Sequence, residues 1–220
     1  MKKMLLLFGL CGALSADFTL EFDFDGFKNS FYYKSDQAAK LEIYDGTNRS
    51  YLYRVGKKSY MLQYAAKKAY YVDMDEMRAL MNAQNESPYS GDLHEIENIA
   101  KPKVLKRGKK INFAGVKAEE WIVEENDLMS GERRKISMVL SNQKDLVEAM
   151  EKFSEMLNLL NSDGGFDAMS IDGYYVIASE GMKLLSFSKE SIDDEKLLIP
   201  KDALKSDMAT IGKMMMVDEK

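Results

Sequence analysis

The sequence predicts a mainly β protein with some α-helix, built as a curved antiparallel half-barrel sheet with two or three helices packed on the concave face. Three observations carry this prediction. Apolar and polar residues alternate in short segments, and turn signals such as Asp45-Gly46 and Gly56-Lys57 recur between Leu41 and Val72. Two other segments change to a helical period. Alternation with regular turns is typical of antiparallel hairpins, whereas a period of three to four residues indicates a helix.

The clearest strands come first. In Phe18–Phe24 the apolar side chains take every second position, which predicts a sheet with one buried and one wet face. The Asp25-Gly26 turn should connect this strand to the next. Further strands are expected at Phe27–Lys34 and Ala38–Tyr44, and then in two segments that carry Tyr51, Tyr53, Tyr60 and Tyr64. Tyrosine suits a half-exposed sheet surface because the ring packs while the hydroxyl stays solvated.

A first helix is predicted over Asp73–Gln84. Asp73 is its expected N-cap, with Glu76 three positions later in capping-box spacing. One helical stripe is almost wholly Met and Leu, which predicts a buried face. The next segment, Asn85–Pro102, is polar and rich in turn residues, so it is either a loop or a loop with one short helix.

The second half of the chain should hold further strands and a second helix. The expected strands are Lys103–Leu105, Lys110–Phe113, Val116–Glu124 and Arg133–Leu140, with the Arg107-Gly108-Lys109-Lys110 turn as a charged hairpin tip. After Asn142 as a cap, apolar residues at helical spacing predict a helix: Leu146, Met150, Phe153, Leu157 and Leu160. Met169–Ser179 and Lys183–Lys189 should form a closing hairpin that turns near Glu180-Gly181.

The N-terminus has the pattern of a signal peptide over residues 1–16. Lys2 and Lys3 precede an apolar stretch, and Leu14-Ser15-Ala16 is a plausible cleavage site. Cleavage would leave one domain, residues 17–220, without a thiol, which suits the bacterial periplasm. Two alternatives stay open: an N-terminal buried strand or anchor helix, and lipidation of Cys11. No other apolar run is long enough to span a membrane.

Composition argues against several function classes. The net charge of −5 argues against nucleic acid as a partner. His94 is the only histidine and lies in a polar segment, so no catalytic residue is expected. The scattered acidic residues do not match a calcium loop, and no metal or other cofactor is expected. Hydrolysis by a carboxylate pair is the weakest functional alternative.

Six apolar residues are candidates for the lining of a ligand cavity between sheet and helices: Met74, Met77, Met81, Trp121, Phe153 and Leu157. The alternative for each is plain core packing. The sixteen methionines favour a cavity because Met adapts to irregular shapes. The segment Asn85–Pro102 could then act as a lid.

Two blocks of the sequence form a recognisable pattern. The first includes Ile43-Tyr44-Asp45-Gly46, Lys58-Ser59-Tyr60-Met61, Ala69-Tyr70-Tyr71 and Asp73-Met74-Asp75-Glu76-Met77. The second joins Gly108-Lys109-Lys110 to the segment Ala114–Trp121. This pattern resembles the domain-of-unknown-function family 4412, over roughly residues 18–160. Val116 and Ala118 stand where that family often has Tyr and Cys.

That resemblance implies the fold of the periplasmic lipoprotein carrier LolA and its receptor LolB, an incomplete antiparallel barrel around a hydrophobic cavity. It implies no catalytic residues. We therefore expect an exported, noncatalytic protein that binds a hydrophobic ligand, either a lipid or the acyl chains of a lipoprotein. The alternative is an envelope protein–protein interaction module with a closed core, which would dock its partner through an exposed tyrosine-rich face or a sheet edge.

Overall fold

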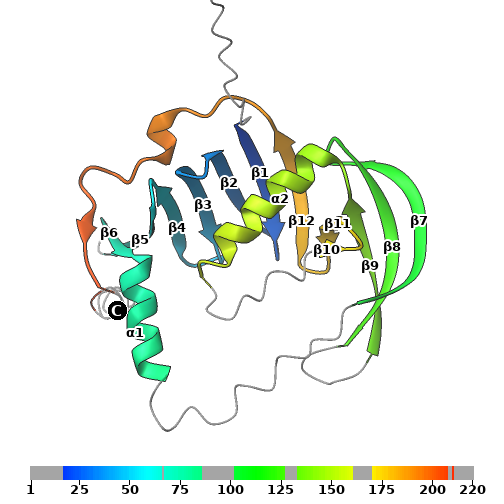
Figure 1. Cartoon of the computed structure of the whole chain (residues 1–220), viewed down its shortest axis with the longest axis horizontal. Coiled ribbons are helices and arrows are strands. Elements are labelled where there is room, and N and C mark those ends of the chain that lie inside the picture. Colours follow the sequence, from blue (N-terminus) through cyan, green and yellow to red (C-terminus); the bar gives the residue numbers. More distant parts are fainter. Residues whose placement is uncertain are drawn as a thin grey trace, which may run out of the picture.

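The structure is a computed structural model that describes residues 17–65, 67–85, 102–126, 133–160, 170–207 and 210. Within these residues, thirteen strands form one curved sheet that does not close into a barrel (Figure 1). The hydrogen-bonded order is β13-β6-β5-β4-β3-β2-β1-β12-β11-β9-β8-β7, and β10 pairs with β11. All pairs are antiparallel except β13 with β6.

The strand bounds follow the alternating segments of the sequence. The first six strands are β1 (Phe18–Phe24), β2 (Phe27–Ser35), β3 (Ala38–Tyr44), β4 (Arg49–Val55), β5 (Lys58–Ala65) and β6 (Lys68–Asp73). The others are β7 (Lys103–Phe113), β8 (Val116–Asn126), β9 (Arg133–Ser141), β10 (Ser170–Ile171), β11 (Tyr174–Ser179), β12 (Met182–Ser188) and β13 (Leu204–Lys205).

One helix, α2 (Lys144–Leu157), packs across the sheet, and we call the face that it contacts the inner face. The stripe predicted for this helix is buried: Leu146, Met150 and Phe153 are all fully covered. The Phe153 ring stacks on Phe22 of β1, with 4.8 Å between ring centroids. This main core also contains inward-facing residues of β2, β3, β4, β8, β11 and β12.

Helix α1 (Met74–Asn85) continues directly from β6 and projects from that end of the sheet (Figure 1). At its beginning, Met74 is buried in the main core, and Met77 is partly buried against it. The Asp73 carboxylate accepts a hydrogen bond from the Asp75 N–H at 3.0 Å, which confirms Asp73 as the N-cap.

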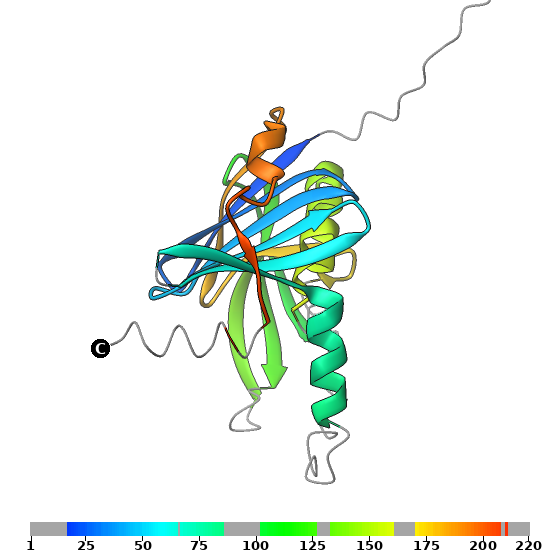
Figure 2. The ribbon, with the colours of Figure 1, turned by 90° about the vertical axis from the view of Figure 1, so that its left-hand side faces the viewer.

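The outer face of the sheet, opposite α2, is crossed by the segment 189–207, which we call the strap. It contains a short 3₁₀ helix, η3 (Asp194–Leu197), and ends with β13 beside β6. Figure 2 shows the strap in front of the sheet and α2 behind it. Ile192 and Leu197 anchor the strap by burial, and Ile199 packs against Tyr53 and its neighbours.

A second buried cluster lies under β10 and β11. In β8, Val116 and Ala118 belong to the main core, whereas Trp121 and Val123 belong to this second cluster. Because successive side chains of a strand point to opposite faces, Ala118 and Trp121 lie on opposite sides of the sheet. The buried face of β8 therefore changes partway along the strand, at Glu119-Glu120.

The structure confirms a mainly β, antiparallel, open sheet, but it corrects several details. The Arg107–Lys110 segment is not a hairpin tip, because β7 continues through it with a register shift. Gly108 makes this shift feasible, since a Cβ at this position would collide with the Glu120 carbonyl oxygen. The N-cap of α2 is Gln143 rather than Asn142. Two or three helices on the concave face are not confirmed, since α2 is the one helix among the described residues that crosses the sheet.

The closing hairpin is also more divided than predicted. Its first strand is interrupted by a turn at Asp172-Gly173, which separates β10 from β11. Both turn residues have positive φ angles, 51° and 78°, and this conformation ends a strand. No helix in the part of the chain that the structure describes has the length and apolar character needed to cross a membrane.

Candidate functional site: the tyrosine groove

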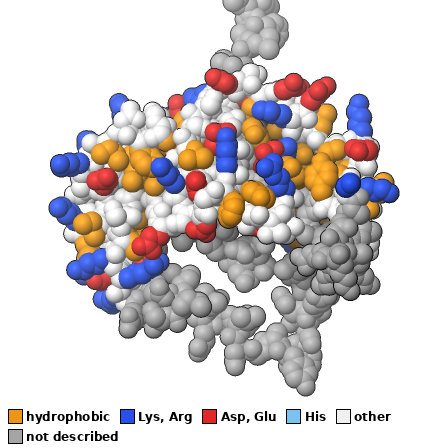
Figure 3. Space-filling view, turned by 180° about the vertical axis from the view of Figure 1, so that it is seen from behind, with side chains coloured by type: hydrophobic (Ala, Val, Ile, Leu, Met, Phe, Trp, Pro, Cys, Tyr) orange, Lys and Arg blue, Asp and Glu red, His pale blue; other side chains and the backbone are white. Residues whose placement is uncertain are grey.

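The candidate site is a groove of about 540 Å³ between the outer face of the sheet and the strap, which we call the tyrosine groove. The sheet side is formed by β3, β4 and β5, and the opposite side by the strap. Its lining residues are Lys40, Glu42, Tyr51, Tyr53, Tyr64, Glu195, Lys196, Leu198, Ile199, Pro200 and Lys201. This volume lies in the range of ordinary ligand sites. Seen from behind, apolar and charged side chains are mixed over the molecule (Figure 3).

Strand alternation brings the tyrosines to this face. Leu41 and Leu52 point into the main core, so their neighbours Lys40, Tyr51 and Tyr53 point outward. The Tyr51 ring meets Tyr64 edge to face, with 5.9 Å between centroids. Tyr53 is almost fully buried, whereas half of Tyr64 is exposed (50%). The groove therefore has a packed aromatic floor and an accessible aromatic edge.

Lys40 is held at the centre of this aromatic surface. Its Nζ lies 4.9 Å from the Tyr51 ring centroid and 5.5 Å from that of Tyr53. The same atom pairs with the Glu42 carboxylate at 2.6 Å, and only 12% of the Lys40 side chain is exposed. Cation–π attraction strengthens as water is excluded, so these contacts fix Lys40 and its tyrosines as one unit.

The titratable groups of the groove include two tyrosines whose pKa values are raised. Burial raises the pKa of Tyr53, and burial also raises the pKa of Tyr64, so both hydroxyls stay protonated at neutral pH. A protonated tyrosine hydroxyl donates and accepts hydrogen bonds, but it is a poor nucleophile. Among the lining residues that the structure describes, none is a histidine, cysteine or serine. The arrangement can hold a ligand through ring contacts, hydrogen bonds and the lysine charges.

A smaller pocket of about 240 Å³ adjoins the groove and shares Glu42 and Tyr51 with it. Glu21 lies in this pocket and binds the Lys28 ammonium at 2.6 Å and the Ser186 hydroxyl at 2.8 Å. The hydrogen bond from Lys28 lowers the pKa of Glu21. Together, the two pockets form a hollow on the outer face that runs from β5 to β1.

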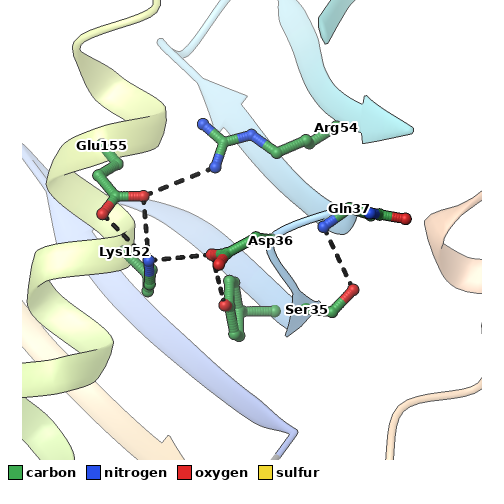
Figure 4. Close-up of polar contacts among 7 residues, drawn as sticks. Ser35, Asp36, Gln37, Arg54, Lys152 and Glu155 are labelled. Carbon is green, nitrogen blue, oxygen red and sulfur yellow. Dashed lines mark hydrogen bonds and ion pairs between the residues drawn. The ribbon is translucent and has the colours of Figure 1, made fainter. Parts of the chain in front are cut away.

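A polar cluster at the β2–β3 turn ties α2 to the sheet (Figure 4). Lys152 of α2 binds Asp36 at 2.9 Å and Glu155 at 3.1 Å, and Glu155 also lies 3.6 Å from Arg54 of β4. Tyr33 donates to Asp36 at 2.8 Å, and burial together with this hydrogen bond raises the pKa of Tyr33 to about 12. Every charge in this cluster has an opposite partner, which indicates a structural clamp.

The structure does not bring all the candidate cavity residues together. Met74, Phe153 and Leu157 are buried in the main core, and Met77 contacts its border. Trp121 is fully buried in the second cluster, where its Nε1 donates to Glu119 at 3.1 Å and Arg107 stacks on its ring at 4.4 Å. Trp121 thus lies on the opposite side of the sheet from Phe153.

Other sequence predictions concern parts of the chain that the structure does not describe. The signal peptide with Cys11, the candidate lid from residue 86 to residue 101, and His94 lie outside the described residues, as does the side chain of Met81. Where the structure does describe the chain, no group of three or more His, Cys, Asp or Glu side chains is arranged to hold a metal ion.

Sequence reasoning found the tyrosines of the groove but missed its other half. The alternation at Tyr51, Tyr53, Tyr60 and Tyr64 indicates a tyrosine-rich face. The strap gives no such signal because Leu198-Ile199-Pro200 has neither a helical nor a strand period. The one available hint is Pro200 among apolar residues, which favours an extended segment.

Comparisons of the chain with protein-family models, curated proteins and solved structures found no match. The resemblance to family 4412 and to the lipoprotein-carrier fold therefore stays a prediction.

Proposed function

We propose that this chain is a noncatalytic binding protein that docks an extended polypeptide segment of an envelope partner in the tyrosine groove. The observation that carries the proposal is the strap. Ile199 and Ala203 of the strap pack on the same cluster as Tyr51, Tyr53 and Tyr60. The outer face therefore already accepts one extended segment of polypeptide, and the open groove leaves room beside it.

The chemistry of the groove favours this class of ligand. Aromatic rings offer large contact area at a low cost in conformational entropy, and protonated hydroxyls can bind a peptide backbone. Lys201 and Lys196 add positive charge on the strap side, whereas Glu42 is already neutralised by Lys40. Beside α2, by contrast, Phe22, Phe31 and Phe153 pack together and fill the interface between the helix and the inner face.

We also propose export to the periplasm. The two lysines, the short apolar stretch and the Ser15-Ala16 site support a cleavable signal peptide. An envelope protein is then the natural class of partner. The open antiparallel sheet with a helix across it is compatible with the carrier-like architecture that the resemblance implies.

Site-specific photocrosslinking in the native cell tests the docking proposal. A photoreactive residue at position 64 should give a discrete crosslinked product, whereas the same residue at Glu148, exposed on α2, should not. Tyr51→Ala should weaken capture at least fivefold, as expected for an aromatic hot spot, and mass spectrometry should map the captured segment. Equal capture from positions 64 and 148 would contradict the proposal.

A hydrophobic ligand is a second candidate, favoured by apolar side chains at the border of the main core. Met61 of β5, Met77 of α1, and Leu159 and Leu160 after α2 are only partly buried there. These side chains lie near the ends of both helices, and an acyl chain would pack against them there. Native mass spectrometry of protein purified from the periplasm should then detect an adduct of lipid mass that is lost on denaturation. A bare protein that also rejects fluorescent acyl probes would remove this candidate.

A further inference from the structure

A pocket at the far end of the sheet, distinct from the tyrosine groove, is lined mainly by hydrogen-bond donors. It has a volume of about 340 Å³ and lies along β7 and β8, where these strands adjoin Asn142 and β11. The donors are the side chains of Lys110, Asn112, Lys117, Asn142 and Tyr174. We propose that this pocket, the donor pocket, binds the phosphate group of a small phosphomonoester or of a lipid headgroup.

Strand pairing explains why these donors meet. Asn112 lies opposite Lys117, and Lys110 lies opposite Glu119, so two cross-strand pairs share one face. The β8–β9 register, in which Glu119 lies opposite Leu140, carries this row toward Asn142. Tyr174 closes the row from β11, and its ring packs on Trp121 with 4.8 Å between centroids.

The donors have no competing partners within the described residues. None of the five side chains makes a hydrogen bond or an ion pair there, although the Tyr174 ring is packed. Glu119, the one carboxylate among the described lining residues, accepts the Trp121 indole N–H at 3.1 Å, so it is partly occupied. The described lining therefore carries the ammonium groups of Lys110 and Lys117, which have no ion-pair partner there, and the carboxylate of Glu119, which already accepts a hydrogen bond.

Charge segregation over the molecule supports an anionic ligand. The chain has a net charge of −5, yet five of the eleven residues of β7 are Lys or Arg. Among these five, only Arg107 has an ion pair in the described part of the chain, with Asp172 at 2.8 Å. Lysine and arginine side chains accordingly gather along the margin where β7 lies (Figure 3).

Edge protection alone does not account for the pocket. Lysines on an edge strand discourage pairing with other chains, and this explains Lys106 and Lys109. It does not explain why Asn112, Asn142 and Tyr174 line a hollow together with Lys110 and Lys117. A phosphate group uses all of these donors, because its oxygens accept several hydrogen bonds and carry negative charge at neutral pH, about −1.5 to −2 in a monoester and about −1 in the diester of phosphatidylglycerol. The volume leaves room for the group that carries the phosphate.

The test uses the mature full chain and amide chemical-shift titrations. The probes are inorganic phosphate, glycerol 3-phosphate, and vesicles of phosphatidylglycerol or of phosphatidylcholine. Saturable shifts at Lys117 and Asn142 are expected with at least one phosphate probe. Lys110→Gln and Lys117→Gln should each weaken that binding about tenfold, because each removes one charged hydrogen bond. Lys109→Gln, an exposed change in the same strand outside the pocket, is the matched control and should change affinity less than about twofold.

The probes distinguish the two sources of phosphate. Binding of glycerol 3-phosphate that depends on Lys110 and Lys117 indicates a soluble phosphomonoester. Binding confined to phosphatidylglycerol vesicles, with the same dependence, indicates a lipid headgroup. The proposal is overturned if every probe binds more weakly than about 1 mM, or if Lys109→Gln weakens binding as much as the two lining variants. These outcomes are independent of the tyrosine groove, since the two sites share no residue.

Discussion

On strands β1 to β5, side chains of the inner face pack in the main core or at its border, whereas side chains of the outer face line two open pockets. Phe22, Phe31 and Leu52 of the inner face are at most 1% exposed. On the outer face of the same strands, Tyr51 and Tyr64 border the tyrosine groove. The two faces differ because a helix with a continuous apolar stripe covers one, and a short irregular strap covers the other.

This difference shows how one sheet can supply both stability and a binding surface. Period-two alternation separates the two tasks residue by residue, so a change on one face leaves the other side chains in place. The inner face gains from apolar burial, which grows with the area removed from water. The outer face retains polar tips and charges that a partner can contact. Substitutions on the two faces should therefore have separable effects.

The largest effect is expected for Phe153→Ala on α2. Removing a fully buried ring that contacts Phe22 and Phe31 should lower the free energy of unfolding by about 3–5 kcal/mol. Urea unfolding followed by circular dichroism measures this. Glu151→Ala, exposed on the same helix, is the control and should change stability by less than about 0.5 kcal/mol. A loss below about 1 kcal/mol for Phe153→Ala would mean that the inner face is not closed at this point.

A smaller and more local effect is expected in the strap. Leu197 is buried in η3, which lies against β3 and β4. Leu197→Ala should therefore lower the free energy of unfolding by about 2 kcal/mol. Its main result should be faster hydrogen exchange at strap amides, such as Ser206 N–H, which donates to the Tyr71 carbonyl. The exposed neighbour Leu198 provides the matched Leu→Ala control. If the amides of α2 lose protection as much as those of the strap, then the strap and the inner core unfold as one unit.

The elements with a local signal could be predicted from the sequence. Alternation in Phe18–Phe24 and the 4, 3, 4 spacing from Leu146 to Leu157 depend only on neighbouring residues, and both predict the buried faces that the structure shows, whereas Leu160 lies beyond the end of α2. The Asp73 cap was predictable for the same reason. The tyrosine-rich face followed from the alternation of Tyr51 and Tyr53.

Features set by distant partners could not be predicted in this way. The apolar positions of β8 change phase between Ala118 and Trp121, and the two glutamates between them are the only trace of this change in the sequence. Which face each half buries depends on β10 and β11, more than forty residues further along. The groove likewise needs the strap, whose position is fixed by long-range contacts such as Lys34 with Asp194 at 2.6 Å.

The smallest effect is expected at Asp73, which is the last residue of β6 and the N-cap of α1. Its carboxylate binds Lys58 at 2.6 Å, and this hydrogen bond lowers the pKa of Asp73 below the ordinary value of 3.8. A lowered pKa in the folded state stabilises the fold above the ordinary value, and this contribution disappears as pH falls through the folded pKa. Asp73→Asn keeps a side-chain oxygen for the cap but loses the charge. It should lower the free energy of unfolding by about 1 kcal/mol or less at neutral pH, because the exposed Lys58 makes the ion pair weak.

Urea unfolding of both proteins over a series of pH values tests this sign. The stability difference should be full at neutral pH, begin to shrink near the ordinary aspartate pKa, and vanish at more acidic pH, where Asp73 is protonated in both states. A difference that stays constant with pH would mean that the Asn side chain disturbs the cap itself. The ion pair with Lys58 would then contribute nothing measurable, and the start of α1 would depend on its backbone hydrogen bond alone.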